Sequence, residues 1–396
     1  MRENDENENV GFNSKQSESL ILDSRVVLRL RFSVSSFFAK ITPVIVTRIN
    51  IAIAAIFISA VAALAQTKKP TPFSELAAYT GADREQLLLA GAKSEGKVVW
   101  YTSLGGGSYK AMIQAFESKY PGVKVEVYRA GGSELVTRIM EETKARRAIV
   151  DTVESTGETL MALRDLRMLA PFTAPYLRNY PEEARERAGK ELFYWITARE
   201  SYVGFAYNKS KVTAGAVAKN FDGLLNQDLK GRLALGTGGS GAEIVGAMLR
   251  IKGEAWVRKL KAQEIRLFSL AAPAIRDMVS SGEIDAAPSV FQTHALEAAE
   301  KGAPVGWEPL DIVPTHAGAA VVIARPPHPH AALLLADFLL SPDGQAIFER
   351  FKYGSASKEY GFKRWYPENG LTVEQYEREV GKWEKIMHSI VVRKGG

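Results

Sequence analysis

Short apolar runs alternate with helix-like segments along most of the chain, and this alternation constrains the fold more than any other feature. Val98-Val99-Trp100-Tyr101 has the pattern of a buried strand, and a helix pattern over 109–120 follows it and stops at Pro121-Gly122. The same order recurs later, where a strand-like run at 286–290 precedes a helix pattern over 292–301. Such alternation is typical of layered α/β proteins, so the expected fold class is α/β.

The same reasoning predicts the other elements. Further strands are expected at 123–128, 149–153, 233–235 and 321–323, and further helices at 83–94, 134–147, 242–252, 275–281 and 331–340. With 396 residues the chain is long enough for two domain-sized cores, so a two-lobed protein is expected.

Composition narrows the class of partner. The formal net charge is +6, but no long run of Lys and Arg concentrates it, and no stacking platform of interleaved basic and aromatic residues is visible. Nucleic-acid binding is therefore not expected, whereas a modestly basic surface suits an anionic ligand. The chain has no cysteine, which excludes disulfides, thiol catalysis and lipid attachment at a cysteine.

Residues 48–65 have the pattern of a secretory signal peptide. Arg48 precedes an apolar run from Ile51 to Ala65, broken only by Ser59, which closes on an A-x-A site and is followed by polar residues. Cleavage is expected after Ala65. A membrane anchor is the alternative, but a span needs about 20 apolar residues and this run is shorter. We therefore expect a periplasmic protein, and we expect residues 1–47 to be a disordered or non-native extension.

Glycine- and serine-rich loops follow several expected strands, at 102–108, 131–133 and 237–240. Ligands of such sheets bind beyond the carboxyl ends of the strands, where helix N-termini present unpaired N–H groups that favour anions. Glycine allows close backbone approach, and a serine either binds ligand or caps its helix. Ligand contacts are expected from these loops and from the end of the third strand, at Thr102, Ser103, Gly132, Ser133, Ser155, Thr156, Gly239 and Ser240.

Six stretches are similar to one known family. In order, between residues 83 and 351, they read LLAGAKSEGKVVWYTS, AFESKYPGVKVEVYRAGGSELVTRI, YVGFAYNKSKV, LKGRLALG, VSSGEIDAAPSV and HPHAALLLADFLLSPDGQAIF. On these motifs the chain resembles the extracellular solute-binding proteins of ABC importers (family 1), in the cluster of bacterial ferric-ion-binding proteins. The last stretch is the most specific, because an Ala-rich helix that closes on LLSPDGQ is a family signature.

The resemblance implies a periplasmic binding protein type II fold, in which two crossover strands join two lobes that hold ligand between them. Mapped onto this chain, lobe 1 is expected at 66–206 and again at 315–396 with the C-terminal helices, and lobe 2 at 207–314. The crossovers are expected at 202–208 and 318–324. The implied function is capture of a small solute and its delivery to an ABC permease in the inner membrane, by a monomer that needs no cofactor and is not an enzyme.

One departure from the family concerns iron. Ferric-binding members carry two adjacent tyrosines after the strand equivalent to 286–290, whereas this chain reads Val290-Phe291-Gln292-Thr293-His294 there. Fe(III) prefers hard phenolate oxygens, and phenylalanine has none. No metal is therefore expected at the site, and the expected cargo is an organic or oxyacid anion or another small polar metabolite. Ferric iron held in a non-standard site remains the alternative.

Three further residues are candidate ligand contacts. Arg199 lies just before the first expected crossover, and its guanidinium suits a carboxylate or a phosphate, although a surface salt bridge is the other interpretation. Tyr202 either borders the ligand or belongs to the core. Gln292 occupies the turn that bears ligand contacts in the family.

No sequence motif indicates catalysis. The chain has five histidines and many serines, but no G-x-S-x-G elbow, H-E-x-x-H or P-loop lysine motif. Two alternatives to an importer component remain: a binding protein that serves a sensor, which would share the cleft, and a periplasmic hydrolase on a similar fold. A hydrolase predicts turnover instead of stoichiometric binding.

Overall fold

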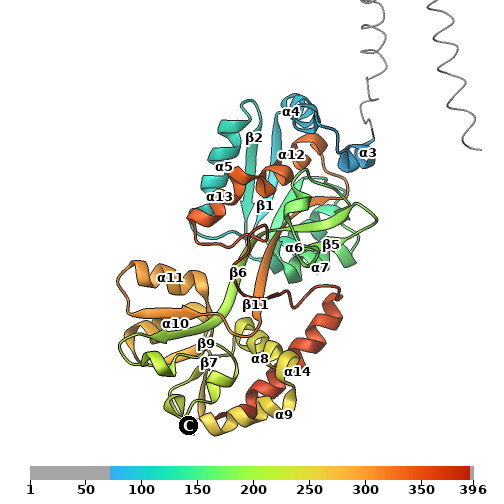
Figure 1. Cartoon of the computed structure of the whole chain (residues 1–396). Coiled ribbons are helices and arrows are strands. Elements are labelled where there is room, and N and C mark those ends of the chain that lie inside the picture. Colours follow the sequence, from blue (N-terminus) through green and yellow to red (C-terminus); the bar gives the residue numbers. More distant parts are fainter. Residues whose placement is uncertain (1–71, 393–396) are drawn as a thin grey trace, which may run out of the picture. The chain divides into compact units, whose positions relative to one another are not determined.

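The computed structural model describes residues 72–392, and within them the expected α/β alternation is present (Figure 1). The predicted extension at 1–47 and the predicted signal peptide at 48–65 lie outside the described residues. Most of the expected elements are found within one to three residues of their predicted bounds. The strand expected at 321–323 is the exception, because it begins at Val313 and runs to Ile323, whereas the third strand, expected at 149–153, forms three residues later at Thr152–Thr156.

The first lobe is built around a sheet whose central strands are parallel. Strand β1 pairs in parallel with β2 on one side and with β3 on the other. Side chains alternate across this sheet: Trp100 packs with Phe116 and Phe338 on one face, and Tyr101 packs with Leu135 on the other. The elements of this lobe are α3 (Phe73–Ala78), α4 (Arg84–Glu95), β1 (Lys97–Thr102), α5 (Ser108–Lys119), β2 (Lys124–Arg129), α6 (Gly132–Lys144), β3 (Thr152–Thr156), α7 (Gly157–Asp165), β4 (Leu169–Ala170), β5 (Arg185–Arg187), α12 (Pro329–Leu340) and α13 (Pro342–Arg350).

The strands of the second lobe form two groups: β7 and β8 pair in parallel, whereas β9 and β10 pair with the long strand β6 (Phe193–Asn208), and a bridge between Leu233 and Ala286 joins the groups. Leu235 and Ile244 belong to one buried cluster of this lobe, and Val290 and Ile275 belong to another. Strands and helices thus pack against each other in this lobe too, as the alternating patterns predict. Its elements are β7 (Ala234–Gly236), α8 (Gly239–Lys252), α9 (Glu254–Val257), β8 (Ile265–Phe268), α10 (Ala272–Ser281), β9 (Ala286–Phe291), α11 (Gln292–Glu300) and β10 (Val305–Glu308).

Two long strands, β6 (Phe193–Asn208) and β11 (Val313–Ile323), connect the lobes (Figure 1). They pair with each other in antiparallel fashion over Ile196–Tyr202, and from Val203 onward β6 pairs with β9 and β10 of the second lobe. The protein therefore has the two-lobed α/β fold with two crossover strands.

The return crossover lies earlier than the sequence indicated. Residues 318–322 pair with β3 inside the sheet of the first lobe, so the expected segment at 318–324 is a sheet strand and the crossing falls near Thr315 and His316. The run Ala319–Val322 is completely buried, which explains why its apolar pattern marks a core strand rather than a connection.

The end of the chain corrects a second expectation. Residues 315–396 were assigned to the first lobe with the C-terminal helices. Helix α14 (Val373–Ile390) instead packs Met387 and Ile390 into the core of the second lobe, and β13 (Val391–Val392) pairs with β8 there. Tyr376 and Trp383 of the same helix pack with the first lobe. A long amphipathic helix has enough apolar surface to contact both lobes.

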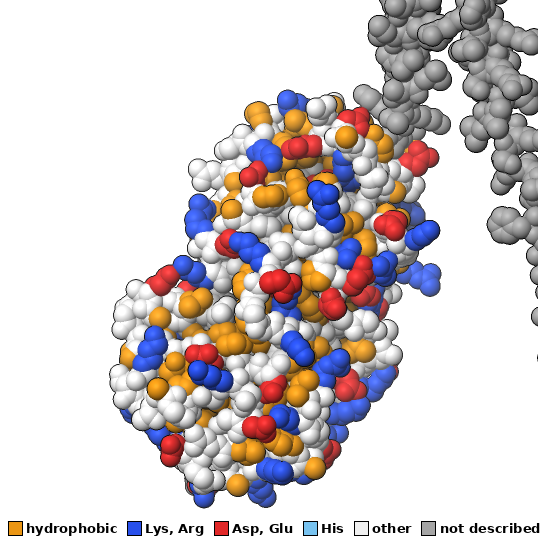
Figure 2. Space-filling view, in the orientation of Figure 1, with side chains coloured by type: hydrophobic (Ala, Val, Ile, Leu, Met, Phe, Trp, Pro, Cys, Tyr) orange, Lys and Arg blue, Asp and Glu red, His pale blue; other side chains and the backbone are white. Residues whose placement is uncertain are grey.

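Two global properties follow from the described residues. Basic and acidic side chains are interspersed over both lobes on the face shown in Figure 2, so the net positive charge is not gathered in one patch there. Among residues 72–392 no single helix is long and apolar enough to cross a membrane; α12 and α13 pass that test only as a pair bent by 58°.

Candidate ligand-binding site

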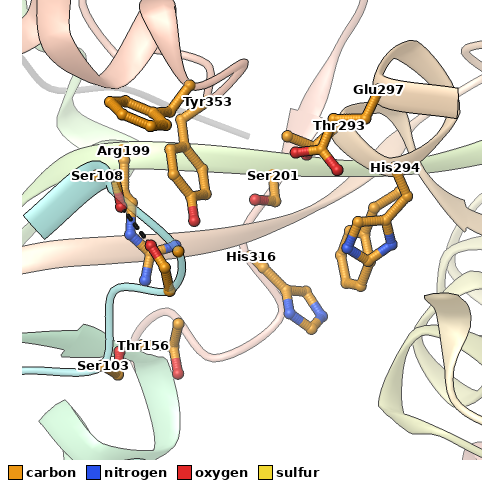
Figure 3. A pocket seen from close by; sticks show the side chains of 14 residues that line it. Ser103, Ser108, Thr156, Arg199, Ser201, Thr293, His294, Glu297, His316 and Tyr353 are labelled. Atoms are coloured by element: carbon orange, nitrogen blue, oxygen red, sulfur yellow. Dashed lines mark hydrogen bonds between the residues drawn. The ribbon is translucent and has the colours of Figure 1, made fainter. Parts of the chain in front are cut away.

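A cavity of about 610 Å³, called the cleft below, opens where the two lobes meet the crossover strands (Figure 3). Ser103, Ser108 and Thr156 reach it from the first lobe. Thr293, His294 and Glu297 reach it from helix α11 of the second lobe. Arg199 on β6 and His316 on β11 come from the strands that connect the lobes. A ligand in the cleft would therefore contact both lobes and both crossovers.

Arg199 is the principal cation of the cleft. Only 6% of the residue is exposed, its Nε donates a 2.8 Å hydrogen bond to Glu154 Oε1, and its guanidinium carbon lies 4.9 Å from the centre of the Tyr353 ring. Gly318 makes room for it, because a Cβ there would lie 2.6 Å from the guanidinium carbon. No residue in the described part of the chain accepts a hydrogen bond from the two terminal nitrogens of Arg199.

Glu154 fixes the orientation of that guanidinium. It is completely buried, and its second oxygen accepts a 2.6 Å hydrogen bond from Thr102 Oγ1. This pair leaves little net charge at this end of the cleft, but it holds the arginine fork with its free donors toward the cavity. Such a fork suits an acceptor with two oxygens, such as a carboxylate or a phosphate.

The N-terminus of helix α5 adds further donors. The helix begins at Ser108 after Gly105–Gly107, and no side chain caps its first turn. The hydroxyl of Ser103 is buried and has no hydrogen-bond partner among the described residues. Unpaired N–H groups at a helix start and a buried free hydroxyl both favour a bound anion or another acceptor.

The opposite wall comes from the start of helix α11. Burial and the nearby Arg276 lower the pKa of His294, and its Nδ1 has no partner among the described residues. His316 packs its ring against Phe291, with 4.7 Å between ring centres, and its Nε2 bonds Glu243. Burial opposes the protonation of His316, but the Glu243 carboxylate outweighs it and raises the pKa of the histidine.

Of the residues expected from the sequence to bind ligand, the structure brings Ser103, Thr156 and Arg199 together in the cleft. Three others have buried side chains that contact protein. Thr102 bonds Glu154, Ser240 Oγ donates to the carbonyl of Ser289, and Tyr202 bonds Glu200 and packs on Tyr360. These three positions correct the sequence interpretation, because strand alternation and helix packing turn their side chains into the core.

The remaining expected residues lie outside the cleft. Ser155 is completely buried next to Gly132, on the opposite side of β3 from Thr156. Ser133 is exposed on α6. Gln292 lines a different cavity with Tyr207 and Trp307. Gly239 lines a smaller cavity that adjoins the cleft.

Several residues of the cleft were missed by the sequence reasoning. They are Ser201, Thr293, His294, Glu297, His316 and Tyr353, whereas Ser108 ends the loop at 102–108 from which ligand contacts were expected. Helical spacing is a signal that would have found two of them, because positions 293 and 297 are four residues apart and share a face of α11. No local pattern marks Ser201, His316 or Tyr353, which reach the cleft through the crossover and a distant loop. No group of three or more His, Asp or Glu side chains within 72–392 is placed to hold a metal ion.

Comparison with known proteins decides the family. A family described as bacterial extracellular solute-binding protein matches residues 104–354. The chain belongs to that family. Membership of this extracellular family implies that the protein acts outside the cytoplasm. No curated protein matches the sequence.

Solved structures show the same fold. The substrate-binding protein of an ABC transporter from Agrobacterium tumefaciens aligns with a TM-score of 0.58 at 20% identity, over 75% of this chain and 96% of that one. Iron-bound HitA from Pseudomonas aeruginosa aligns with a TM-score of 0.56 at 22% identity, over 75% of this chain and 99% of that one. AfuA from Actinobacillus pleuropneumoniae, with fructose-6-phosphate bound, aligns with a TM-score of 0.55 at 18% identity, over 74% of this chain and 99% of that one. At these identities the likeness establishes the fold and not the ligand.

Proposed function

We propose that this solute-binding protein is the periplasmic component of an ABC importer and that it captures a small, polar, anionic solute between its lobes. The observation that carries the anionic class is Arg199, whose two terminal nitrogens face the cleft while Glu154 holds its Nε. The unpartnered Ser103 hydroxyl and the uncapped start of α5 support it, because both supply hydrogen-bond donors to the same cavity.

Capture would use the two crossover strands as a hinge. Arg199 and His316 lie on these strands, and the lobes supply the two opposing walls. A ligand that contacts both walls favours the closed arrangement over the open one, because its differential contacts shift the equilibrium. The closed form would then dock on a membrane permease; the substrate-binding protein of an ABC transporter from Agrobacterium tumefaciens shares this fold.

Export to the periplasm would use the signal peptide expected at 48–65. Mass spectrometry of the mature protein tests this directly. A first residue of Gln66 supports cleavage after Ala65, and retention of Ile51 would contradict it.

A thermal-shift panel tests the ligand class. Residues 66–396 are mixed with organic acids, phosphate esters, phosphonates, sugars, amino acids and polyamines, and with ferric iron in the presence of a synergistic anion. A ligand present at 100 times its dissociation constant stabilises the protein by about 2.7 kcal/mol, which raises Tm by a few degrees.

A phosphate or carboxylate hit supports the proposal. Stabilisation by ferric iron alone would contradict the anionic class, and steady turnover of an ester would favour the hydrolase alternative.

A further inference from the structure

A second cavity, of about 170 Å³, adjoins the cleft and is lined by carboxylates; we call it the acidic cavity. Glu158, Glu243 and Glu368 line it, together with Tyr376. It shares Thr156 and His316 with the cleft, so the two cavities adjoin at these residues. The acidic cavity combines α7 of the first lobe, α8 of the second lobe and the segment before α14.

Two of the three carboxylates are stabilised without a ligand, one by hydrogen bonds and the other by solvent and a helix dipole. Glu243 bonds His316, and it accepts a 3.1 Å hydrogen bond from the hydroxyl of Tyr376. Glu158 is exposed and lies in the first turn of α7, where a negative charge complements the helix dipole.

Glu368 is different. Only 7% of it is exposed, and no other residue in the described part of the chain gives its carboxylate a hydrogen bond or an ion pair. Its carboxyl group lies against Gly157, where a Cβ would come within 2.7 Å of it. Burial, with further contributions from Glu243 and Glu158, raises the pKa of Glu368 to about 7. The charge of His316 and the backbone N–H of Glu368 itself oppose that rise in pKa, but no cationic side chain bonds the carboxylate within residues 72–392, and a cation placed beside it would lower the cost of burying its charge.

The acidic cavity lies close to Arg199. In the sheet, Arg199 on β6 pairs with Gly318 on β11, and Gly318 pairs with Thr156 on β3. Neighbouring strands are about 4.8 Å apart, so the Cα atoms of Arg199 and Thr156 are separated by roughly 10 Å. Gly157, on which Glu368 rests, is the next residue after Thr156. Donors for an anion in the cleft and acceptors for a cation in the acidic cavity thus lie within the length of a small metabolite.

We propose that the ligand is a small zwitterion, whose anionic group binds Arg199 and whose ammonium group enters the acidic cavity beside Glu368. This inference rests on the proposed function and narrows its substrate class. The ammonium would donate charge-assisted hydrogen bonds to Glu368 and Glu158, and these are stronger than bonds between neutral groups.

Matched ligand pairs test the inference. Isothermal titration compares ethyl phosphate with O-phosphoethanolamine, and the three- and four-carbon alkyl phosphates with their terminal amines. The expected result is that at least one amine binds about ten-fold tighter, or more, than its amine-free partner. If the amine-free partner of every pair binds as tightly as its amine, the proposal of a zwitterionic ligand is wrong, while the proposal of anion capture stands. If no member of any pair binds, both proposals fail for phosphates and the zwitterion is overturned with the anion site.

Variants of the lining carboxylates test whether the ammonium group of the ligand binds in the acidic cavity. Glu368→Gln and Glu158→Gln should each weaken binding of the preferred amine several-fold and leave its amine-free partner unchanged. Glu158 is exposed and its side chain makes no hydrogen bond or ion pair within residues 72–392, so its variant is informative even where Glu368→Gln folds poorly. Glu297→Gln is the matched control, because it removes a carboxylate from the cleft on the α11 side. If Glu297→Gln abolishes the amine preference and the other two variants do not, the ammonium lies elsewhere and the assignment to the acidic cavity is overturned.

Discussion

Two buried carboxylates near the crossover strands, Glu154 and Glu368, differ in how completely the protein satisfies them. Glu154 has no exposed surface, and it is bonded by Arg199 and by Thr102. Glu368 is nearly as buried, yet no cationic side chain bonds it within the described residues. The first carboxylate completes a structural unit that orients Arg199 in the cleft. Glu368 has no such cationic partner. The difference indicates that the Arg199 end of the site is already ordered without ligand, whereas the Glu368 end gains a partner only if a cation binds there.

Breaking the Glu154 pair should have the largest effect. Arg199→Met leaves a buried carboxylate without its partner, so we expect the free energy of unfolding to fall by about 3–5 kcal/mol. Urea denaturation measures it. Adding Glu154→Gln to this variant should restore part of the loss, because the uncompensated charge is gone. A loss below about 1 kcal/mol in Arg199→Met would mean that the pair does not hold the site together.

Glu368→Gln should raise the free energy of unfolding, and it should do so only at higher pH. Burial raises the folded-state pKa of Glu368 from its usual value of 4.5 to about 7, so the folded state binds more protons than the unfolded state between these values. Stability of the wild type therefore falls as pH rises from about 4.5 to about 7.

The glutamine variant lacks this contribution. We expect it to be about 1–3 kcal/mol more stable than the wild type at pH 8. This advantage should disappear near pH 4.5. Denaturation curves at both pH values, with exposed Glu374→Gln as the control, check it. Equal stability of wild type and Glu368→Gln at pH 8 would show that the carboxylate has a partner after all.

A smaller effect is expected from the free hydroxyl on the anion side. Ser103→Ala removes a buried oxygen that has no partner among the described residues, so stability should stay constant or rise slightly. Affinity for the phosphate that binds in titration should fall by several-fold, because an unbonded donor is lost. Ser133→Ala is the matched control: the sequence also suggested Ser133 as a ligand contact, but it is exposed on α6. Equal affinity losses in the two variants would remove Ser103 from the site.

The fold could be predicted from the sequence because it depends on local periodicity. Buried strands such as β1 and β9, and helices such as α5 and α12, each have a clear apolar pattern and a turn at their ends. The 16-residue strand β6 was the hard case. It belongs to two sheets in succession, and which partner each half finds is a tertiary property.

The candidate site was predicted only in part, for a related reason. Ser103 and Thr156 follow strands whose carboxyl ends meet at one edge, so strand order alone brings them together. His316 and Tyr353 enter from β11 and from the loop after α13, and Glu368 from the segment before α14. Their placement depends on how the chain returns from the second lobe, which no spacing in the sequence encodes.

The most direct test of the central claim is whether the two walls approach each other when ligand binds. The chain has no cysteine, so Lys110→Cys on α5 and Lys301→Cys after α11 can carry a spin-label pair without background labelling. Both positions are exposed, one on each lobe. Pulsed electron paramagnetic resonance should give a shorter distance once the protein is saturated with the phosphate that binds in titration, and the shift should be absent in Arg199→Met. An unchanged distance with ligand bound would contradict capture between the lobes.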